Sequence, residues 1–305
     1  MVFSSFSFLF LFLPAALLAY YIVPQRLRSV RNGVLLCFSL AFYFFGEPKG
    51  IFLITGMILL SYLAALGMDK TSRPGLRRLL LTVTLVLSMG ALCFYKYLGF
   101  LLDNLNSLFR TSLPVPEIVM PIGISFFTFQ SMSYVIDVYR KKVPAQKNPF
   151  RVALYVSLFP QLIAGPIVRY ETVANELADR KETLEAFSQG LGRFILGLFK
   201  KVFFANTLGS AAETLFGLTS RSALLAWVGA LLYALQIYYD FSGYSDMAIG
   251  LGRIFGFRMD KNFDYPYASC SITEFWKKWG RRSPCSDTGA VAISSADSEG
   301  GFGSC

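Results

Sequence analysis

The chain has 305 residues, of which 54% are hydrophobic, 16% are charged and none is histidine. Soluble domains carry about 25% charged residues, whereas this chain repeats apolar runs near the ~20 residues that cross a bilayer. The composition therefore excludes a soluble globular protein. Because unpaired backbone groups are not tolerated in lipid, the predicted fold class is all-α: a polytopic transmembrane helical bundle with re-entrant and interfacial helices.

The apolar runs predict membrane spans over residues 6–23, 33–46, 51–67, 79–97, 117–138, 152–168 and 222–251. The first span has no basic segment before it and no cleavage site after it, so we expect it to be retained. The segment 98–116 is weakly amphipathic and is expected to form a loop on the outer face. The stretch 184–208 places basic residues opposite an apolar face, which predicts an amphipathic helix in the interface plane.

The net charge of +10 is concentrated in three short basic segments, at residues 26–31, 70–78 and 140–151. If the first span runs from outside to inside, all three segments fall on one face of the membrane. This is the positive-inside pattern, and it places the N-terminus outside. We therefore interpret the charge as a topology signal and expect no nucleic-acid partner.

The five cysteines are scattered, and no spacing resembles a zinc ligand set or a disulfide framework. With no histidine either, we expect no metal site. Two glycine pairs, Gly190 with Gly192 and Gly250 with Gly252, do not follow strands and are not dinucleotide fingerprints. Close helix packing explains them better.

The span that follows Met120 is unusually polar and includes Gln130. Two readings stay open: hydrogen bonding between packed helices, or the wall of a substrate tunnel. The next run contains Pro160, Gln161, Gly165 and Pro166. Proline removes a backbone donor, so this run predicts a broken or re-entrant segment that lines a cavity. The alternative is a loop at a helix end.

The last long span carries Asp240, Ser242, Tyr244 and Asp246 within one short run. Ionisable groups at membrane depth are costly and usually line a bundle interior or a wet cavity. We interpret these four residues as candidate tunnel lining, with hydrogen bonding between helices as the alternative.

Beyond this span, Ser271 and Glu274 match a capping box that opens a helix. Trp276 and Trp279 share one face of that helix and suit the membrane–water boundary. We expect Glu274 and the two tryptophans to close the cavity near the interface.

Five motifs in this order carry a resemblance to a known family: PIGISFFTFQSMSYVIDVYR, LFPQLIAGPIVRY, QIYYDFSGYSDMAIGLGRIFGF, NFDYPY and ITEFWKKW. Together they resemble the membrane-bound O-acyltransferase family, in its bacterial alginate O-acetylase branch, over residues 1–279. The resemblance implies a multi-pass protein of the bacterial inner membrane that uses a donor such as acetyl-CoA, with no other cofactor. It further implies transfer of the acetyl group through a tunnel to an exported polysaccharide, by way of a separate periplasmic acetyltransferase.

The resemblance also places a first histidine directly after the Trp-x-x-Trp motif, where this chain has Gly280, and the catalytic histidine further downstream. A histidine would act as general base near neutral pH. We therefore name no catalytic residue and expect the chain to be inactive as written. Residues 280–305 are rich in Ser, Gly and Ala and are expected to be disordered. If the codons for these residues are read in a shifted frame, they can encode Trp-x-Arg-x-Tyr-Leu-x-x-x-Leu-Gly-Gly. We therefore interpret the sequence as truncated or frameshifted after Trp279.

Two other functions remain open at the level of sequence. Broken helices and carboxylates at the membrane midplane also suit a transporter, although the two halves show no internal repeat. The chain could also be a non-catalytic membrane partner in an exopolysaccharide assembly.

Overall fold

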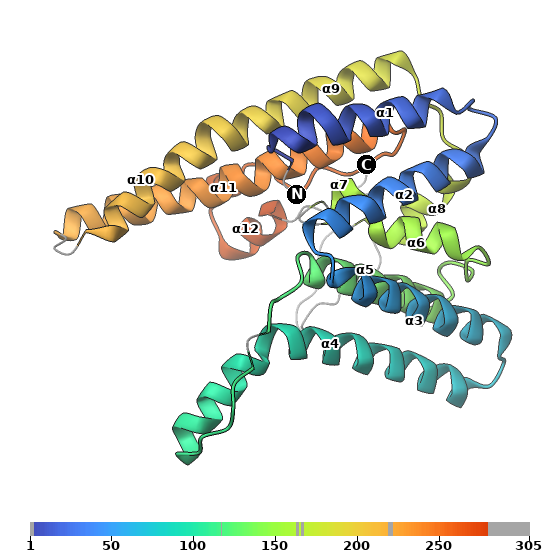
Figure 1. Cartoon of the computed structure of the whole chain (residues 1–305), viewed down its shortest axis with the longest axis horizontal. Helices are drawn as coiled ribbons and strands as arrows, with labels where there is room; N and C mark the ends of the chain where they lie inside the picture. The colour runs from blue at the N-terminus through green and yellow to red at the C-terminus, as the bar shows by residue number, and fades with distance from the viewer. Residues whose placement is uncertain (1–2, 117, 163–164, 166–167, 219–221, 280–305) are drawn as a thin grey trace, which may run out of the picture. The chain divides into compact units, whose positions relative to one another are not determined.

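The computed structural model describes residues 3–116, 118–162, 165, 168–218 and 222–279, and these residues form helices joined by short turns (Figure 1). The chain divides into two units, Met1–Asp260 and Lys261–Cys305. Four helices are long and apolar enough to cross a membrane: α2 (Arg28–Gly46), α3 (Gly50–Lys70), α4 (Pro74–Phe109) and α11 (Ala223–Ile254). The chain is therefore an all-α, multi-pass membrane protein.

The first predicted span is a shorter apolar helix, with a π-helical turn η1 (Ser7–Phe12) that continues into α1 (Leu13–Ile22). Its buried Phe8 and Phe12 pack against Phe42 of α2. The short run predicted over 33–46 gains the length it needs from residues 28–32 at its start.

The prediction of an outer loop over residues 98–116 was wrong for most of that segment, because α4 continues to Phe109. Apolar residues recur through this segment, and its one aspartate, Asp103, is exposed and needs no partner. The span predicted over 117–138 begins later, as α5 (Ile124–Tyr139), because Gly123 takes a left-handed φ of 75° directly before it.

The span predicted over 152–168 is broken, as its prolines suggested. Helix α6 (Pro149–Ser157) ends before Leu158, and a single turn α7 (Phe159–Leu162) follows. Phe159 packs against Phe12 and Phe42, so the break lies in the aromatic core of the first unit. After it come α8 (Tyr170–Ala178) and a connection to α9 in which Arg180 is buried.

The stretch predicted as an amphipathic helix over 184–208 is helical and extends further. It consists of α9 (Leu184–Phe199), a π-helical turn η2 (Lys200–Ala205) and α10 (Asn206–Gly217). Thr183 caps its start by accepting a hydrogen bond from the Ala186 N–H at 3.1 Å. Figure 1 shows this helix running antiparallel beside α11, so one of its faces is covered by protein.

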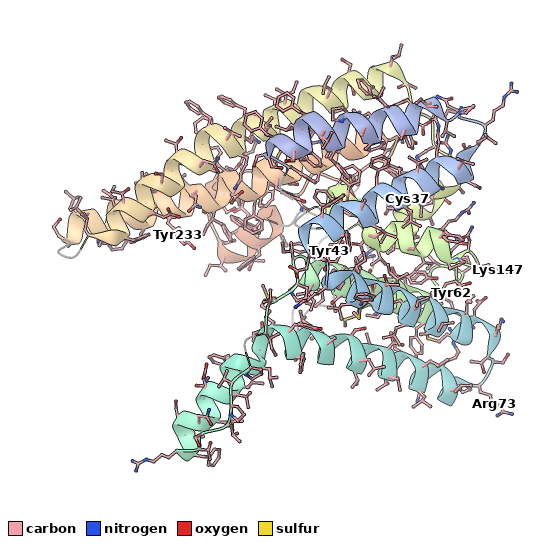
Figure 2. The ribbon with its side chains drawn as sticks, in the orientation of Figure 1. Cys37, Tyr43, Tyr62, Arg73, Lys147 and Tyr233 are labelled. Atoms are coloured by element: carbon pink, nitrogen blue, oxygen red, sulfur yellow. The ribbon has the colours of Figure 1, made fainter. Side chains whose placement is uncertain are left out.

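The three basic segments lie at the α1–α2 turn, at the α3–α4 turn and after α5, which are at the same end of the first unit in Figure 1. Arg73 and Lys147, from the second and third segments, lie at this end in Figure 2. Two contacts hold neighbouring helices together at this end: the Tyr62 hydroxyl of α3 donates to the Lys147 carbonyl at 2.8 Å, and Arg77 of α4 donates to the Tyr139 carbonyl at 2.9 Å. This arrangement fits the predicted topology, whose absolute orientation stays a prediction.

The second unit is described as far as Trp279 and contains a 3-10 turn, η3 (Pro266–Ala268), and α12 (Ile272–Trp279). The tail predicted to be disordered, residues 280–305, lies outside the described residues.

Candidate functional site

Glycines bring α9 and α11 into direct backbone contact. A Cβ atom on Gly250 would lie 2.6 Å from the Gly190 carbonyl oxygen, and one on Gly243 would lie 2.8 Å from the Gly197 carbonyl oxygen. Small residues at such positions let helix backbones approach closely. The predicted packing role is confirmed for Gly190 and Gly250, whereas a Cβ on Gly192 would meet nothing within 4 Å.

The close approach places the carboxylates of α11 against basic residues of α9 and of η2, which continues from it. The Oδ1 atom of Asp246 accepts from Arg193 Nε at 3.0 Å and Nη2 at 2.9 Å, and Oδ2 accepts from Lys200 Nζ at 2.6 Å. Lys200 Nζ also donates to Ser242 Oγ at 3.2 Å. Asp240 forms a separate ion pair with Lys201 Nζ at 2.6 Å. Both oxygens of Asp246 therefore have cationic partners on the neighbouring helix.

These contacts agree with the alternative given in the sequence analysis, hydrogen bonding between helices. The tunnel-lining role of Asp240, Ser242 and Asp246 stays a prediction. The ring of Tyr244 stacks on Phe3, with centroids 4.6 Å apart. The four residues therefore do not converge on one point.

The broken segment brings together two other candidates, Gln130 and Gln161. Because α6 stops at Ser157, the Tyr155 carbonyl lacks the helical N–H that would otherwise pair with it: the Phe159 N–H instead donates to Ser39 Oγ at 3.2 Å. Gln130 Nε2 and Gln161 Nε2 both donate to the Tyr155 carbonyl, at 2.6 and 2.9 Å.

Gln130 and Gln161 are each only 3% exposed, so these hydrogen bonds are formed away from water. Pro160 is buried within α7. A Cβ on Gly165 would lie 2.3 Å from the Gln161 Cα, so only glycine fits this turn. Pro166 lies outside the described residues. The geometry supports a broken, buried segment, and its role as a cavity wall stays a prediction.

In the second unit, Ser271 caps α12 by accepting from the Glu274 N–H at 3.1 Å. Glu274 accepts from the Cys270 N–H at 2.9 Å and pairs with Lys278 at 2.7 Å, and the hydrogen bond from Lys278 holds its pKa below the usual value. The two tryptophans differ: Trp279 stacks on Phe275 with centroids 5.3 Å apart, whereas Trp276 is 63% exposed.

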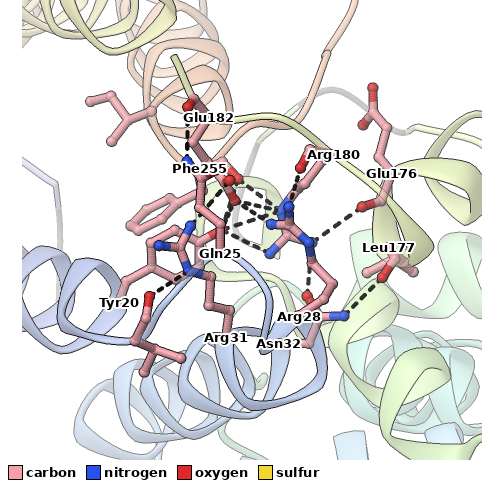
Figure 3. A network of polar contacts seen from close by, with 12 residues as sticks. Tyr20, Gln25, Arg28, Arg31, Asn32, Glu176, Leu177, Arg180, Glu182 and Phe255 are labelled. Atoms are coloured by element: carbon pink, nitrogen blue, oxygen red, sulfur yellow. Dashed lines mark hydrogen bonds and ion pairs between the residues drawn. The ribbon is translucent and has the colours of Figure 1, made fainter. Parts of the chain in front are cut away.

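Sequence reasoning missed a buried polar network around Glu182, at the end of the first unit that carries the first basic segment (Figure 3). The Glu182 carboxylate accepts from the Tyr20 hydroxyl and from Arg28, and Arg31 Nη1 lies 3.1 Å from its Oε2. Burial raises the pKa of Glu182, but the hydrogen bonds from Tyr20 and Arg28 and the charge of Arg28 outweigh this effect and hold the pKa below its usual value.

Arg180 completes the network and reaches the end of α11. Its Nε donates to the Phe255 carbonyl at 2.9 Å, its Nη1 to Asn32 Oδ1 at 2.7 Å and its Nη2 to the Tyr20 hydroxyl at 3.0 Å. Its guanidinium also lies 4.3 Å from the ring centroid of Phe257. Arg180 therefore ties α1, α2 and α11 to the connection before α9.

Three arginines share one glutamate in this network, and carbonyl oxygens compensate for the excess positive charge. Arg31 Nε donates to the Val23 carbonyl at 2.8 Å, and the C-terminal end of α11 presents the Phe255 carbonyl, where the helix dipole is negative. Gly256 then takes a left-handed φ of 83°. A glycine directly after a long apolar helix was the available sequence signal for this end.

Chemically, the described residues offer a network of buried ion pairs and amide contacts that fixes the helices in place. Among the described residues, no group of three or more His, Cys, Asp or Glu side chains could hold a metal ion.

Comparison with known proteins identifies the family. A model of the membrane-bound O-acyltransferase family, MBOAT, matches residues 79–282, which include α9, α11 and the broken segment. The chain belongs to the MBOAT family. It is 44% identical over 286 residues to "Probable alginate O-acetylase AlgI" of Pseudomonas putida, an alignment that covers 92% of this chain and 58% of the relative.

Two further relatives belong to different organisms. The protein of the same name from Pseudomonas aeruginosa is 43% identical over 92% of this chain and 54% of the relative. The peptidoglycan O-acetyltransferase of Helicobacter pylori is 34% identical over 92% of this chain and 59% of the relative. The chain thus spans between 54 and 59% of the length of these MBOAT relatives.

Proposed function

We propose that this chain provides the membrane scaffold of an O-acyltransferase that moves acetyl groups for the O-acetylation of an exported polysaccharide. The observation that carries the proposal is the family match over residues 79–282. Relatives named for alginate and for peptidoglycan both carry O-acetyl transfer in their names, which supports acetyl as the acyl group and an exported polymer as the acceptor.

We propose acetyl-CoA as the donor. A hydroxyl oxygen of the group that first receives the acetyl attacks the thioester carbonyl, the C–S bond breaks, an ester C–O bond forms, and the hydroxyl proton passes to the leaving thiolate. A histidine suits this proton transfer near neutral pH, but the 305 residues contain none. We therefore expect no turnover by this chain alone and assign its residues to positioning the helices rather than to the chemistry.

Two further parts of the proposal concern where the protein lies and which partner it has. They are a location in the bacterial inner membrane with the N-terminus outside, and a periplasmic acetyltransferase that receives the acetyl group. The cytoplasmic side would then hold the end of the bundle with the three basic segments, where the donor is available. Family membership favours acyl transfer over the transporter alternative.

A fusion protein tests the proposal. Residues 1–279 of this chain are joined to the part of the Pseudomonas putida relative that follows the matched region, and the fusion is expressed in a Pseudomonas strain that lacks its own O-acetylase. We expect acetyl esters to return to the secreted polymer with the fusion, and not with this chain alone or with the relative's remaining part alone. A fusion that inserts into the membrane and restores no acetyl ester would contradict the proposal.

A further inference from the structure

Two segments distant in sequence bring exposed cations together at one end of the first unit. Helix α4 begins beside Arg73, Arg77 and Arg78, and α5 ends at Tyr139, which Arg140 follows. Arg77 Nη2 donates to the Tyr139 carbonyl at 2.9 Å, and its guanidinium lies 5.7 Å from the Tyr139 ring centroid. This contact fixes the first turn of α4 against the last turn of α5.

Four cations around this contact are exposed: Arg73, Arg78, Arg140 and Lys141, which we name the α4–α5 basic cluster. No ion pair found among the described residues involves any of the four. Nearby in sequence, Asp69 is exposed, whereas Asp137 is only 6% exposed. The charge of Arg140 acts on the buried Asp137, but the four exposed cations outnumber these two carboxylates, so the cluster keeps a net positive charge.

Lys141 occupies a backbone position that ordinarily favours glycine. Its φ is 57°, its N–H donates to the Val138 carbonyl at 3.0 Å, and the Lys142 N–H donates to the Asp137 carbonyl at 3.0 Å. This is the turn that closes a helix C-terminus, where glycine avoids the strain of the left-handed conformation. A lysine here retains that strain and adds a positive charge to the cluster.

An apolar surface continues directly from the cluster along α4. Leu76, Leu79 and Val83, on the turns that follow Arg73, are 43%, 57% and 44% exposed. They belong to a helix long and apolar enough to cross a membrane. A soluble phosphate compound would contact only the cations, whereas a phospholipid could place its headgroup on the cations and its acyl chains along this surface.

We propose that the α4–α5 basic cluster is a binding site for an anionic phospholipid, with the headgroup phosphate held by Arg73, Arg78, Arg140 and Lys141. Basic residues next to transmembrane helices attract acidic headgroups in this way. The combination of unpaired cations with an adjoining exposed apolar surface selects a lipid over a free anion.

Native mass spectrometry of the full chain in mixed micelles of phosphatidylglycerol and phosphatidylcholine tests the site. We compare the wild type with the variants R73Q/R78Q and R140Q/K141Q. The matched control is K49Q/K96Q, which removes two exposed cations elsewhere in the first unit. We expect each cluster charge removed to lower the affinity for phosphatidylglycerol about fivefold, while phosphatidylcholine binding and the control stay unchanged.

The variant Lys141→Gly distinguishes the effect of the lysine charge on lipid binding from the effect of the backbone strain on stability. Glycine relieves the left-handed strain, so this variant is expected to unfold at the same or a higher temperature than wild type and still to bind less phosphatidylglycerol. Equal losses in the control and cluster variants, or equal losses of the two lipids, would overturn the proposal. Displacement of phosphatidylglycerol by inorganic pyrophosphate at constant ionic strength would also overturn it, in favour of a free-phosphate site.

Discussion

Gly190 and Gly250 face each other across α9 and α11 with no room for a side chain on either. A Cβ on Gly190 would lie 2.7 Å from the Gly250 carbonyl oxygen, and one on Gly250 would lie 2.6 Å from the Gly190 carbonyl oxygen. The same relationship recurs seven residues away, between Gly197 and Gly243. The two helices therefore pack backbone to backbone, and this contact holds Asp246 beside its cationic partners.

Gly250→Ala should separate α9 from α11 and lower the free energy of unfolding by about 1–3 kcal/mol. Gly192→Ala is the matched control on α9, because a Cβ there meets nothing within 4 Å. Alanine is the better helix former, so this variant should be stabilised by up to ~1 kcal/mol. Thermal unfolding in detergent measures both, and equal effects would contradict the packing.

Asp246→Asn should destabilise the protein more than Asp240→Asn. Asp246 has two cationic partners and a side chain 17% exposed, whereas Asp240 has one partner and is 37% exposed. We expect the free energy of unfolding to fall by about 1–3 kcal/mol for Asp246→Asn and by at most ~1 kcal/mol for Asp240→Asn. The same unfolding measurement with Arg193→Gln completes a double-mutant cycle, and strictly additive losses would exclude the pairing.

Glu182→Gln should lower the free energy of unfolding by about 3–5 kcal/mol, because it leaves the buried Arg31 and Arg180 and the partly buried Arg28 without their carboxylate. The exposed Glu185, whose side chain accepts a hydrogen bond from Gln189 Nε2 at 2.9 Å, provides the control. Glu185→Gln should cost less than ~1 kcal/mol.

The contacts of Glu182 also predict that the stability of the protein depends on pH. The folded pKa of Glu182 lies below its ordinary value of 4.5, so its stabilisation is complete above that value and is lost as pH falls through the folded pKa. Wild type should therefore lose stability below about pH 4.5 more steeply than Glu182→Gln. Unfolding curves recorded from pH 7 to pH 3 measure the difference, and parallel pH profiles would contradict the network.

Substitutions of Gln130 and Gln161 should have non-additive effects on the free energy of unfolding, since both side chains donate to the Tyr155 carbonyl. Gln130→Met or Gln161→Met alone leaves that oxygen with one donor. The double variant leaves it buried without either, and an unsatisfied buried group costs about 1–3 kcal/mol. The double variant should thus lose more than the sum of the single losses, and a smaller loss would show that another group satisfies the carbonyl.

The length and pattern of the apolar runs were sufficient to predict long helices that can cross a membrane. The runs at 51–67 and 222–251 are α3 and α11 with small shifts at their ends, and the prolines after Ser157 correctly indicated a break. The segment 98–116 was misjudged because a weakly amphipathic run does not distinguish a loop from the end of a long helix. No residue of α4 after Leu92 is buried, so packing against the rest of the unit does not set that boundary.

The candidate site was harder to predict, because residue type does not show which partner a charge meets. Asp240 and Asp246 were recognised as costly charges, but their cationic partners lie on α9 and η2, within the stretch that sequence placed at the membrane interface. Nothing in the local sequence shows that Arg180 and Glu182 become buried against Tyr20 and the end of α11. Pairings of this kind depend on the fold.

Acetyl transfer in vesicles tests the central claim of the proposed function most directly. Inside-out membrane vesicles that contain either this chain or the fusion with the Pseudomonas putida relative are supplied with labelled acetyl-CoA and the periplasmic components of the same strain. Release of free CoA and labelled ester are both recorded. We predict both products with the fusion and neither with this chain alone. Turnover by this histidine-free chain alone, or none by a correctly inserted fusion, would contradict the account.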